Sequence, residues 1–121
     1  SKCVFSASKH GDHQGWHFDN NFLTLTFMLQ APDEGGLLEV YPRIGRGNYE
    51  AIESILSTER ESHFQAEKGL APGQLPPLLR YKYEVGDMVL FVGRDSLHRS
   101  TPVCGGTTRL IGIVSYNTPT H

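Results

Sequence analysis

Side chains alternate in character along two stretches of the chain, and this alternation restricts the fold more than any other feature of the sequence. In residues 22–29 a Leu- and Phe-bearing face alternates with a face that carries Thr24 and Thr26. In residues 109–116 one face carries Arg109 and the other carries only apolar or small side chains and a tyrosine. A period of two with β-branched and aromatic residues is typical of β-strands. Both stretches are therefore predicted to be strands.

Shorter segments of the same kind lie between these two stretches. Residues 37–41, 79–84 and 88–92 are predicted strands, and Gly86-Asp87 forms a tight turn between the last two. One amphipathic helix is predicted over residues 49–61, with Asn48 as its N-cap. Many short strands with a single helix favour an all-β fold, a barrel or jelly roll, into which that helix is inserted.

Length and composition set further limits. The 121 residues suit a single domain, 1–121, and the net charge of −2 gives no basic surface for nucleic acid. No apolar run has the length of a transmembrane helix. The two cysteines form no CxxC motif, so a reduced, cytoplasmic setting is expected, with one disulfide left open. The Gly- and Pro-rich segment 66–77 is predicted to be a loop and a candidate lid.

Three residues form a candidate metal site: His17, Asp19 and His98. Two imidazoles and one carboxylate are the ligands of non-heme Fe(II) sites that keep coordination positions open. Positions 17 and 19 are two apart, so within a strand both side chains would project from one face. That face would be the inside of the barrel, and His98 would come from a distant strand across it.

A candidate anion-binding residue is Arg109, eleven residues after His98 (109 − 98). Strand parity directs its side chain inward among apolar neighbours, where an unpaired guanidinium would be costly. Its own strand offers no Asp or Glu. We therefore expect Arg109 to bind the carboxylate of an oxo-acid as a planar fork.

Together these segments resemble the Fe(II)- and 2-oxoglutarate-dependent oxygenase superfamily, and its small-molecule hydroxylases most closely. The resemblance covers nearly the whole chain. It rests on the order and spacing of His17-Phe18-Asp19, Gly86-Asp87-Met88-Val89-Leu90-Phe91, Leu97-His98-Arg99-Ser100-Thr101-Pro102-Val103 and Arg109.

The resemblance implies a double-stranded β-helix that holds Fe(II) on His17, Asp19 and His98. It also implies that 2-oxoglutarate chelates the metal with its keto-acid end and contacts Arg109 with its far carboxylate. With O2, and with ascorbate in a supporting role, a small-molecule substrate would be hydroxylated and succinate and CO2 released. An amino acid is the first choice of substrate and a peptidyl side chain the second, and the sequence leaves the oligomeric state open.

The chain departs from the pattern of this superfamily in two places. Many relatives carry Ser or Thr two residues after the arginine, where this chain has Ile111. The second donor to the far carboxylate would then be Thr26, Tyr41 or Ser115. Relatives also carry helices ahead of the barrel, whereas sixteen residues precede His17 here. Either this is a minimal version of the fold or an N-terminal helical part is absent.

Two alternatives concern the chemistry. A cupin-like barrel could bind metal or ligand without oxygenase activity, although such a barrel has no need of a buried Arg109. Halogenases related to the superfamily carry Gly or Ala in place of the metal-binding carboxylate. The presence of Asp19 therefore favours hydroxylation. Arg99, next to His98, could bind a substrate carboxylate or form a salt bridge.

Overall fold

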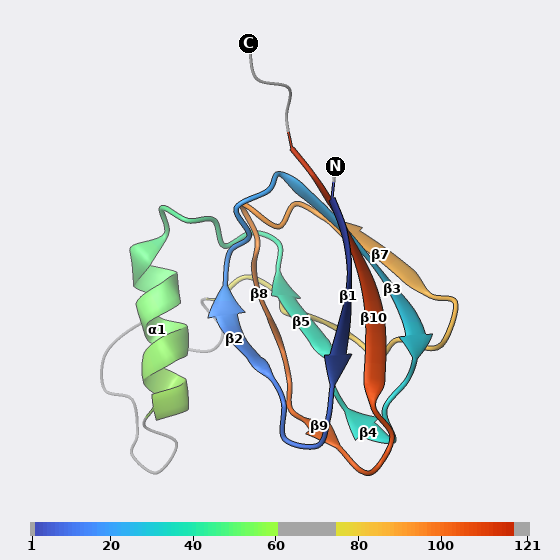
Figure 1. Ribbon diagram of the computed structural model, residues 1–121. Helices are drawn as coiled ribbons and strands as arrows, with labels where there is room; N and C mark the ends of the chain where they lie inside the picture. Colours follow the sequence, from blue (N-terminus) through green and yellow to red (C-terminus); the bar gives the residue numbers. More distant parts are fainter. Residues whose placement is uncertain (1, 61–74, 118–121) are drawn as a thin grey trace.

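The computed structural model describes residues 2–60 and 75–117, which form ten strands and one helix (Figure 1). The mostly β architecture with one inserted helix confirms the expected fold class at this level. The strands are β1 (Lys2–Ser8), β2 (Gln14–His17), β3 (Leu23–Gln30), β4 (Glu34–Gly35), β5 (Leu38–Tyr41), β6 (Leu79–Tyr81), β7 (Met88–Phe91), β8 (Leu97–Ser100), β9 (Val103–Cys104) and β10 (Arg109–Tyr116); the helix is α1 (Tyr49–Arg60).

The strands pair into two four-stranded sheets and one short ribbon. The first sheet has the order β1-β10-β3-β7 and the second has the order β2-β8-β5-β6. Strands β4 and β9 form the ribbon. Every pairing is antiparallel. Strands β10 and β3, the two stretches with the clearest alternation, are neighbours at the centre of the first sheet.

The predicted strands correspond closely to the observed ones. The strand at 109–116 has the predicted bounds, and those predicted at 22–29, 37–41 and 88–92 are each within one residue of the structure at either end. The strand predicted at 79–84 ends earlier, at Tyr81. Strands β1, β4 and β9 were not predicted, and β2 and β8 were expected only as strands of unstated length at His17 and His98. Four of these five have only two to four residues, too few for a period of two to show.

The expected placement of His98 was wrong. Strand β8 does not face β2 across a barrel but pairs with it directly, and His17 and His98 are register partners. Strand β2 also ends at His17, so Asp19 lies just beyond it rather than on it. The parity argument concerned only His17 and Asp19, and it carried no information about which strands are neighbours.

Helix α1 begins as the sequence predicts and lies beside the second sheet (Figure 1). The side chain of Asn48 accepts a hydrogen bond from the backbone N–H of Ala51, the N-cap geometry. The helix buries Ala51 and Ile55 against Leu97 of β8 and Ile44. Most of the candidate lid segment, 66–77, lies outside the described residues. Among the described residues, α1 does not have the length and apolar character needed to cross a membrane.

A second apolar cluster occupies part of the space between the two sheets. It joins Met28 and Ile111 of the first sheet to Leu38 and Val40 of the second, with Tyr83 beside them. Next to this cluster lies a cavity lined mostly by polar side chains, to whose wall the cluster contributes Leu38, Tyr83 and Ile111.

The outer face of the second sheet carries a buried carboxylate. Glu39 is 1% exposed and lies between its register partners Arg80 of β6 and Arg99 of β8. Its two carboxylate oxygens each accept a 2.6 Å hydrogen bond from the Nε of one arginine. Arg99 therefore forms a salt bridge with the protein. Burial would raise the pKa of Glu39, but the two arginines together lower it below its usual value.

We predict that Glu39→Gln destabilises the fold at neutral pH by about 2 kcal/mol, because it removes two charge-assisted hydrogen bonds. A lowered pKa in the folded state stabilises the protein above the pKa of the unfolded chain. This contribution disappears as the pH falls through the folded-state value. Urea denaturation should therefore show a difference between wild type and variant at about pH 7 that shrinks below about pH 4. Glu34→Gln, at an exposed position of β4, is the control, and a pH-independent difference for Glu39→Gln would contradict the prediction.

Candidate metal centre

The two histidines of the centre are oriented by backbone carbonyls. Nδ1 of His17 lies 2.7 Å from the carbonyl oxygen of Gly15, and Nδ1 of His98 lies 2.7 Å from that of Ser96. A carbonyl can only accept a hydrogen bond, so each Nδ1 carries the proton. In the neutral rings both Nε2 atoms therefore present a lone pair, as metal-binding histidines do. The ring centroids are 4.1 Å apart.

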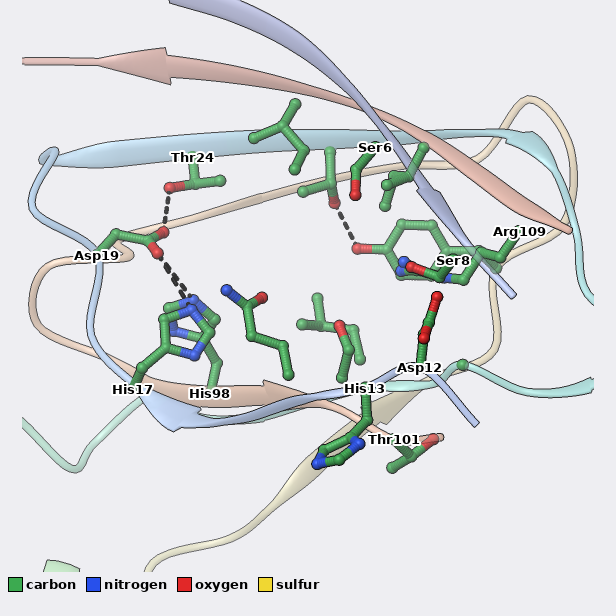
Figure 2. A pocket seen from close by; sticks show the side chains of 18 of the residues that line it. Ser6, Ser8, Asp12, His13, His17, Asp19, Thr24, His98, Thr101 and Arg109 are labelled. Carbon is green, nitrogen blue, oxygen red and sulfur yellow. Dashed lines mark hydrogen bonds and ion pairs between the residues drawn. The ribbon is translucent and has the colours of Figure 1, made fainter. Parts of the chain in front are cut away.

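Asp19 completes the group from the loop that follows β2. Its backbone N–H donates to the carbonyl of Gly93 at 2.9 Å, which fixes the loop beside β7. Its Oδ1 lies 3.4 Å from Nε2 of His17 and 3.2 Å from Nε2 of His98. One ligand atom from each of the three residues lies within 4.8 Å of the others. The structure thus brings the three predicted ligands together (Figure 2).

The electrostatics of this cluster favour a cation. Burial would raise the pKa of Asp19, but with no metal ion bound its carboxylate accepts hydrogen bonds from Nε2–H of His17, from Nε2–H of His98 and from Thr24, and these hold its pKa far below its usual value. Burial would lower the pKa of His17, but Asp19 and the Gly15 carbonyl raise it overall. Two imidazole lone pairs and a carboxylate oxygen directed at one point repel one another unless a positive charge lies between them. The residues therefore fit a divalent metal ion.

The three candidate metal ligands lie at one end of a cavity of about 370 Å³, and Arg109 lies at the other end (Figure 2). Arg109 is 5% exposed, and burial lowers the pKa of its guanidinium. Within residues 2–60 and 75–117 its buried Nε has no hydrogen-bond partner, and no carboxylate forms an ion pair with it. The guanidinium of Arg109 thus lines the cavity, and because it is buried without a counter-charge it would be stabilised by an anion bound there.

A buried phenol lies beside this guanidinium. Tyr83 is 5% exposed, lines the same cavity and is hydrogen-bonded to Thr26, 2.5 Å from hydroxyl to hydroxyl. Burial raises the pKa of Tyr83, so it remains a neutral hydrogen-bond donor or acceptor. Gly36 packs closely against the side chain of Arg109. A Cβ at position 36 would lie only 2.8 Å from Cδ of Arg109, so a larger residue would displace the arginine.

The three residues suggested as second donors fall in different places. Thr26 and Ser115 line the cavity that holds Arg109. Tyr41 is not among its lining residues; its ring packs on Trp16, 5.4 Å between centroids, in the cluster beneath α1. Tyr83 was not predicted as a site residue from the sequence. The available signal was its position two residues after Tyr81, on the continuation of β6.

A family model matches residues 2–121, almost the entire chain, and its description is Halogenase D. The chain belongs to the Halogenase D family. A search of curated proteins found no significant match. The family match and the metal cluster, together with the structural likenesses below, confirm the resemblance to Fe(II)/2-oxoglutarate oxygenases.

Solved structures share the fold at low sequence identity. A prolyl-4-hydroxylase from Pseudomonas putida is 17% identical with a TM-score of 0.57, over 98% of this chain and 51% of that one. An N-substituted L-amino acid dioxygenase from Burkholderia ambifaria, in complex with alpha-KG, is 14% identical with a TM-score of 0.60, over 93% and 48%. This chain therefore spans about half the length of these neighbours.

We predict that His98→Ala lowers the affinity for a divalent ion such as Mn(II) at least about 100-fold, because it removes one of three ligands. Thermal unfolding of the metal-free protein should change little. His13→Ala is the matched control, since His13 lines the cavity but does not belong to the cluster. Titration of Mn(II) by electron paramagnetic resonance measures the affinity. A double variant of His17 and His98 that binds with wild-type affinity would refute the assignment.

Proposed function

We propose that the protein is an Fe(II)- and 2-oxoglutarate-dependent dioxygenase that hydroxylates a small-molecule substrate and releases succinate and CO2. One observation carries the proposal: a single cavity has a cluster of three possible metal ligands at one end and, at the other, the Arg109 guanidinium, whose Nε has no hydrogen-bond partner among the described residues. A metal ion and a dicarboxylate that binds it would satisfy both of these groups at once. A prolyl-4-hydroxylase and an amino acid dioxygenase with the same fold support this class.

His17, Asp19 and His98 would hold the iron. When bound, Fe(II) supplies the activation of O2 and the oxidation of both the co-substrate and the substrate. The residues themselves set the ligand field and the charge. The carbonyls of Gly15 and Ser96 keep each imidazole in the tautomer that binds a metal.

Arg109 would bind the far carboxylate of 2-oxoglutarate, with Tyr83 as the neighbouring hydroxyl donor. This hydroxyl takes the role that relatives give to a Ser or Thr at the position of Ile111. Thr26 would act through Tyr83, because the two hydroxyls are hydrogen-bonded to each other. Ser115 lines the same cavity and is a second candidate donor. These contacts orient the co-substrate and exclude water from its buried end.

We also propose that the fold is a double-stranded β-helix. Two antiparallel four-stranded sheets with the orders β1-β10-β3-β7 and β2-β8-β5-β6, on either side of the cavity, support a double-stranded β-helix. Residues 1–121 would then form one oxygenase core domain. For the substrate we propose an amino acid, because two structural neighbours are named for prolyl and amino acid substrates. A cupin-like barrel without oxygenase activity leaves the buried Arg109 unexplained.

The family description makes halogenation the second candidate reaction. Halogenases related to the superfamily have Gly or Ala at the position of the carboxylate ligand, and this leaves a coordination position for chloride. This chain has Asp19, and its carboxylate has a hydrogen-bond donor in Thr24 and space beside Gly93. A site built around a carboxylate favours hydroxylation.

The proposal predicts succinate formation from 2-oxoglutarate with Fe(II), ascorbate and O2, accelerated by the substrate. Arg109→Lys keeps a positive charge but loses the planar fork, so the apparent KM for 2-oxoglutarate should rise about 10-fold or more, with the metal affinity unchanged. Succinate is measured by mass spectrometry. If Arg109→Lys only lowers thermal stability and 2-oxoglutarate stabilises wild type and variant equally, the arginine has a structural role. Wild-type protein that binds Fe(II) but forms no succinate favours the cupin-like alternative.

The hydroxylation proposal predicts a product heavier by one oxygen even with saturating chloride. Asp19→Gly should sharply reduce hydroxylation, because it removes a ligand and a negative charge that neighbouring groups cannot easily replace. The variant should still consume some 2-oxoglutarate without forming the hydroxylated product. Product mass for both proteins, measured with candidate amino acids, is the test. A chlorinated wild-type product would overturn hydroxylation and leave the metal centre intact.

A further inference from the structure

The two oxygens of the Asp19 carboxylate have different environments. Oδ1 faces Nε2 of both histidines. Oδ2 points away from them and accepts a 2.6 Å hydrogen bond from the hydroxyl of Thr24 on β3 (Figure 2). Thr24 is only 4% exposed, so this bond is shielded from water. A charge-assisted hydrogen bond of this length gives the carboxylate one preferred rotation about its terminal bond.

A second hydrogen bond fixes the direction of the Thr24 proton. Nδ2 of Asn21 donates to Oγ1 of Thr24 at 2.8 Å and to the carbonyl of Leu23 at 2.6 Å. The threonine hydroxyl has a single proton, and its oxygen is already an acceptor toward Asn21. The proton is therefore directed at Asp19. The order of donation runs from Asn21 to Thr24 to Asp19.

Gly93 supplies the space that this arrangement needs. A Cβ at position 93 would lie 2.2 Å from Oδ2 of Asp19 and 2.7 Å from Oγ1 of Thr24. Neither atom is the end of a long flexible chain, so a methyl group there would push the carboxylate away from its donor. The Gly93 carbonyl meanwhile accepts the backbone N–H of Asp19. Gly93 thus holds the backbone of Asp19 by a hydrogen bond, and its lack of a side chain leaves room for the Asp19 carboxylate.

We propose that Thr24 is a positioning residue that, with Asn21 and Gly93, restricts Asp19 to a single coordinating oxygen. This inference rests on the proposed metal centre. With Oδ2 engaged by Thr24, only Oδ1 is available to the ion. The three protein ligands then occupy about half of the positions of an octahedral ion and leave the rest for ligands from solution. Without Thr24, Oδ2 is free to become a second ligand atom and to displace one of them.

The test counts the water molecules on Mn(II) bound to the purified protein. Water-proton relaxation measured at saturating protein reports how many waters the ion retains, independently of turnover. A carboxylate that binds through both oxygens displaces one of about three waters, so Thr24→Val should lower the relaxivity of the bound ion by about a third. Thr24→Ser keeps the hydroxyl and should restore the wild-type value. Gly93→Ala should resemble Thr24→Val, and it decides the matter if Thr24→Val does not fold.

Thr107→Val is the matched control. It removes a hydroxyl that donates to Oδ1 of Asp33 at 2.8 Å, another threonine–aspartate bond, but one outside the metal centre. Its relaxivity should equal that of wild type. A wild-type relaxivity in folded Thr24→Val, or an equal fall in Thr107→Val, would overturn the inference and leave the proposed function standing. Wild-type protein that binds no Mn(II) would overturn both.

Discussion

Three electron-rich atoms directed at one point, two imidazole nitrogens and a carboxylate oxygen, are the constraint on which the rest of this structure depends. Such a cluster needs positive charge, either from a bound cation or from a protonated imidazole, and the chain must hold each of the three atoms in place. Antiparallel pairing of β2 with β8 places His17 directly opposite His98. Carbonyl oxygens fix the two rings, and a threonine fixes the carboxylate. The protein itself thus fixes the positions of all three side chains.

Because these polar groups must be held between the two sheets, polar side chains occupy interior positions that apolar side chains would otherwise fill. Thr24, Thr26, His98 and Arg109 are all buried, although none contributes to an apolar core. Apolar packing is therefore divided between one cluster beside the cavity and another beneath α1, on the outer face of the second sheet. The buried Glu39 and its two arginines add cross-strand bonds to the same sheet. The helix is part of the support for the wall that carries both histidines.

The sequence predicted the parts of the fold that local pattern determines. Long alternating strands and the capped helix were found within a residue or two, because period and capping are local properties. The face of β3 was harder to assign. Leucines would normally face inward, yet Thr24, Thr26 and Met28 do so, while Leu29 is 45% exposed. Thr24 and Thr26 face inward because they line the cavity and are hydrogen-bonded there to Asp19 and Tyr83, whereas hydrophobicity alone predicts the opposite face.

The composition of the candidate site was predictable, but its arrangement was not. Two imidazoles, a carboxylate and a guanidinium were identified by their residue types together with their order and spacing, which resemble the pattern of the superfamily. Whether His98 comes from a neighbouring or an opposite strand depends on the order of strands in a sheet, and both arrangements satisfy the same parity. Thr24 and Gly93 likewise acquire meaning only when β3 and the end of β7 meet at Asp19. Nothing in the sequence around Gly93 indicates that a larger residue there would collide with a carboxylate oxygen. Residues that position ligands are therefore harder to predict from a single sequence than the ligands themselves.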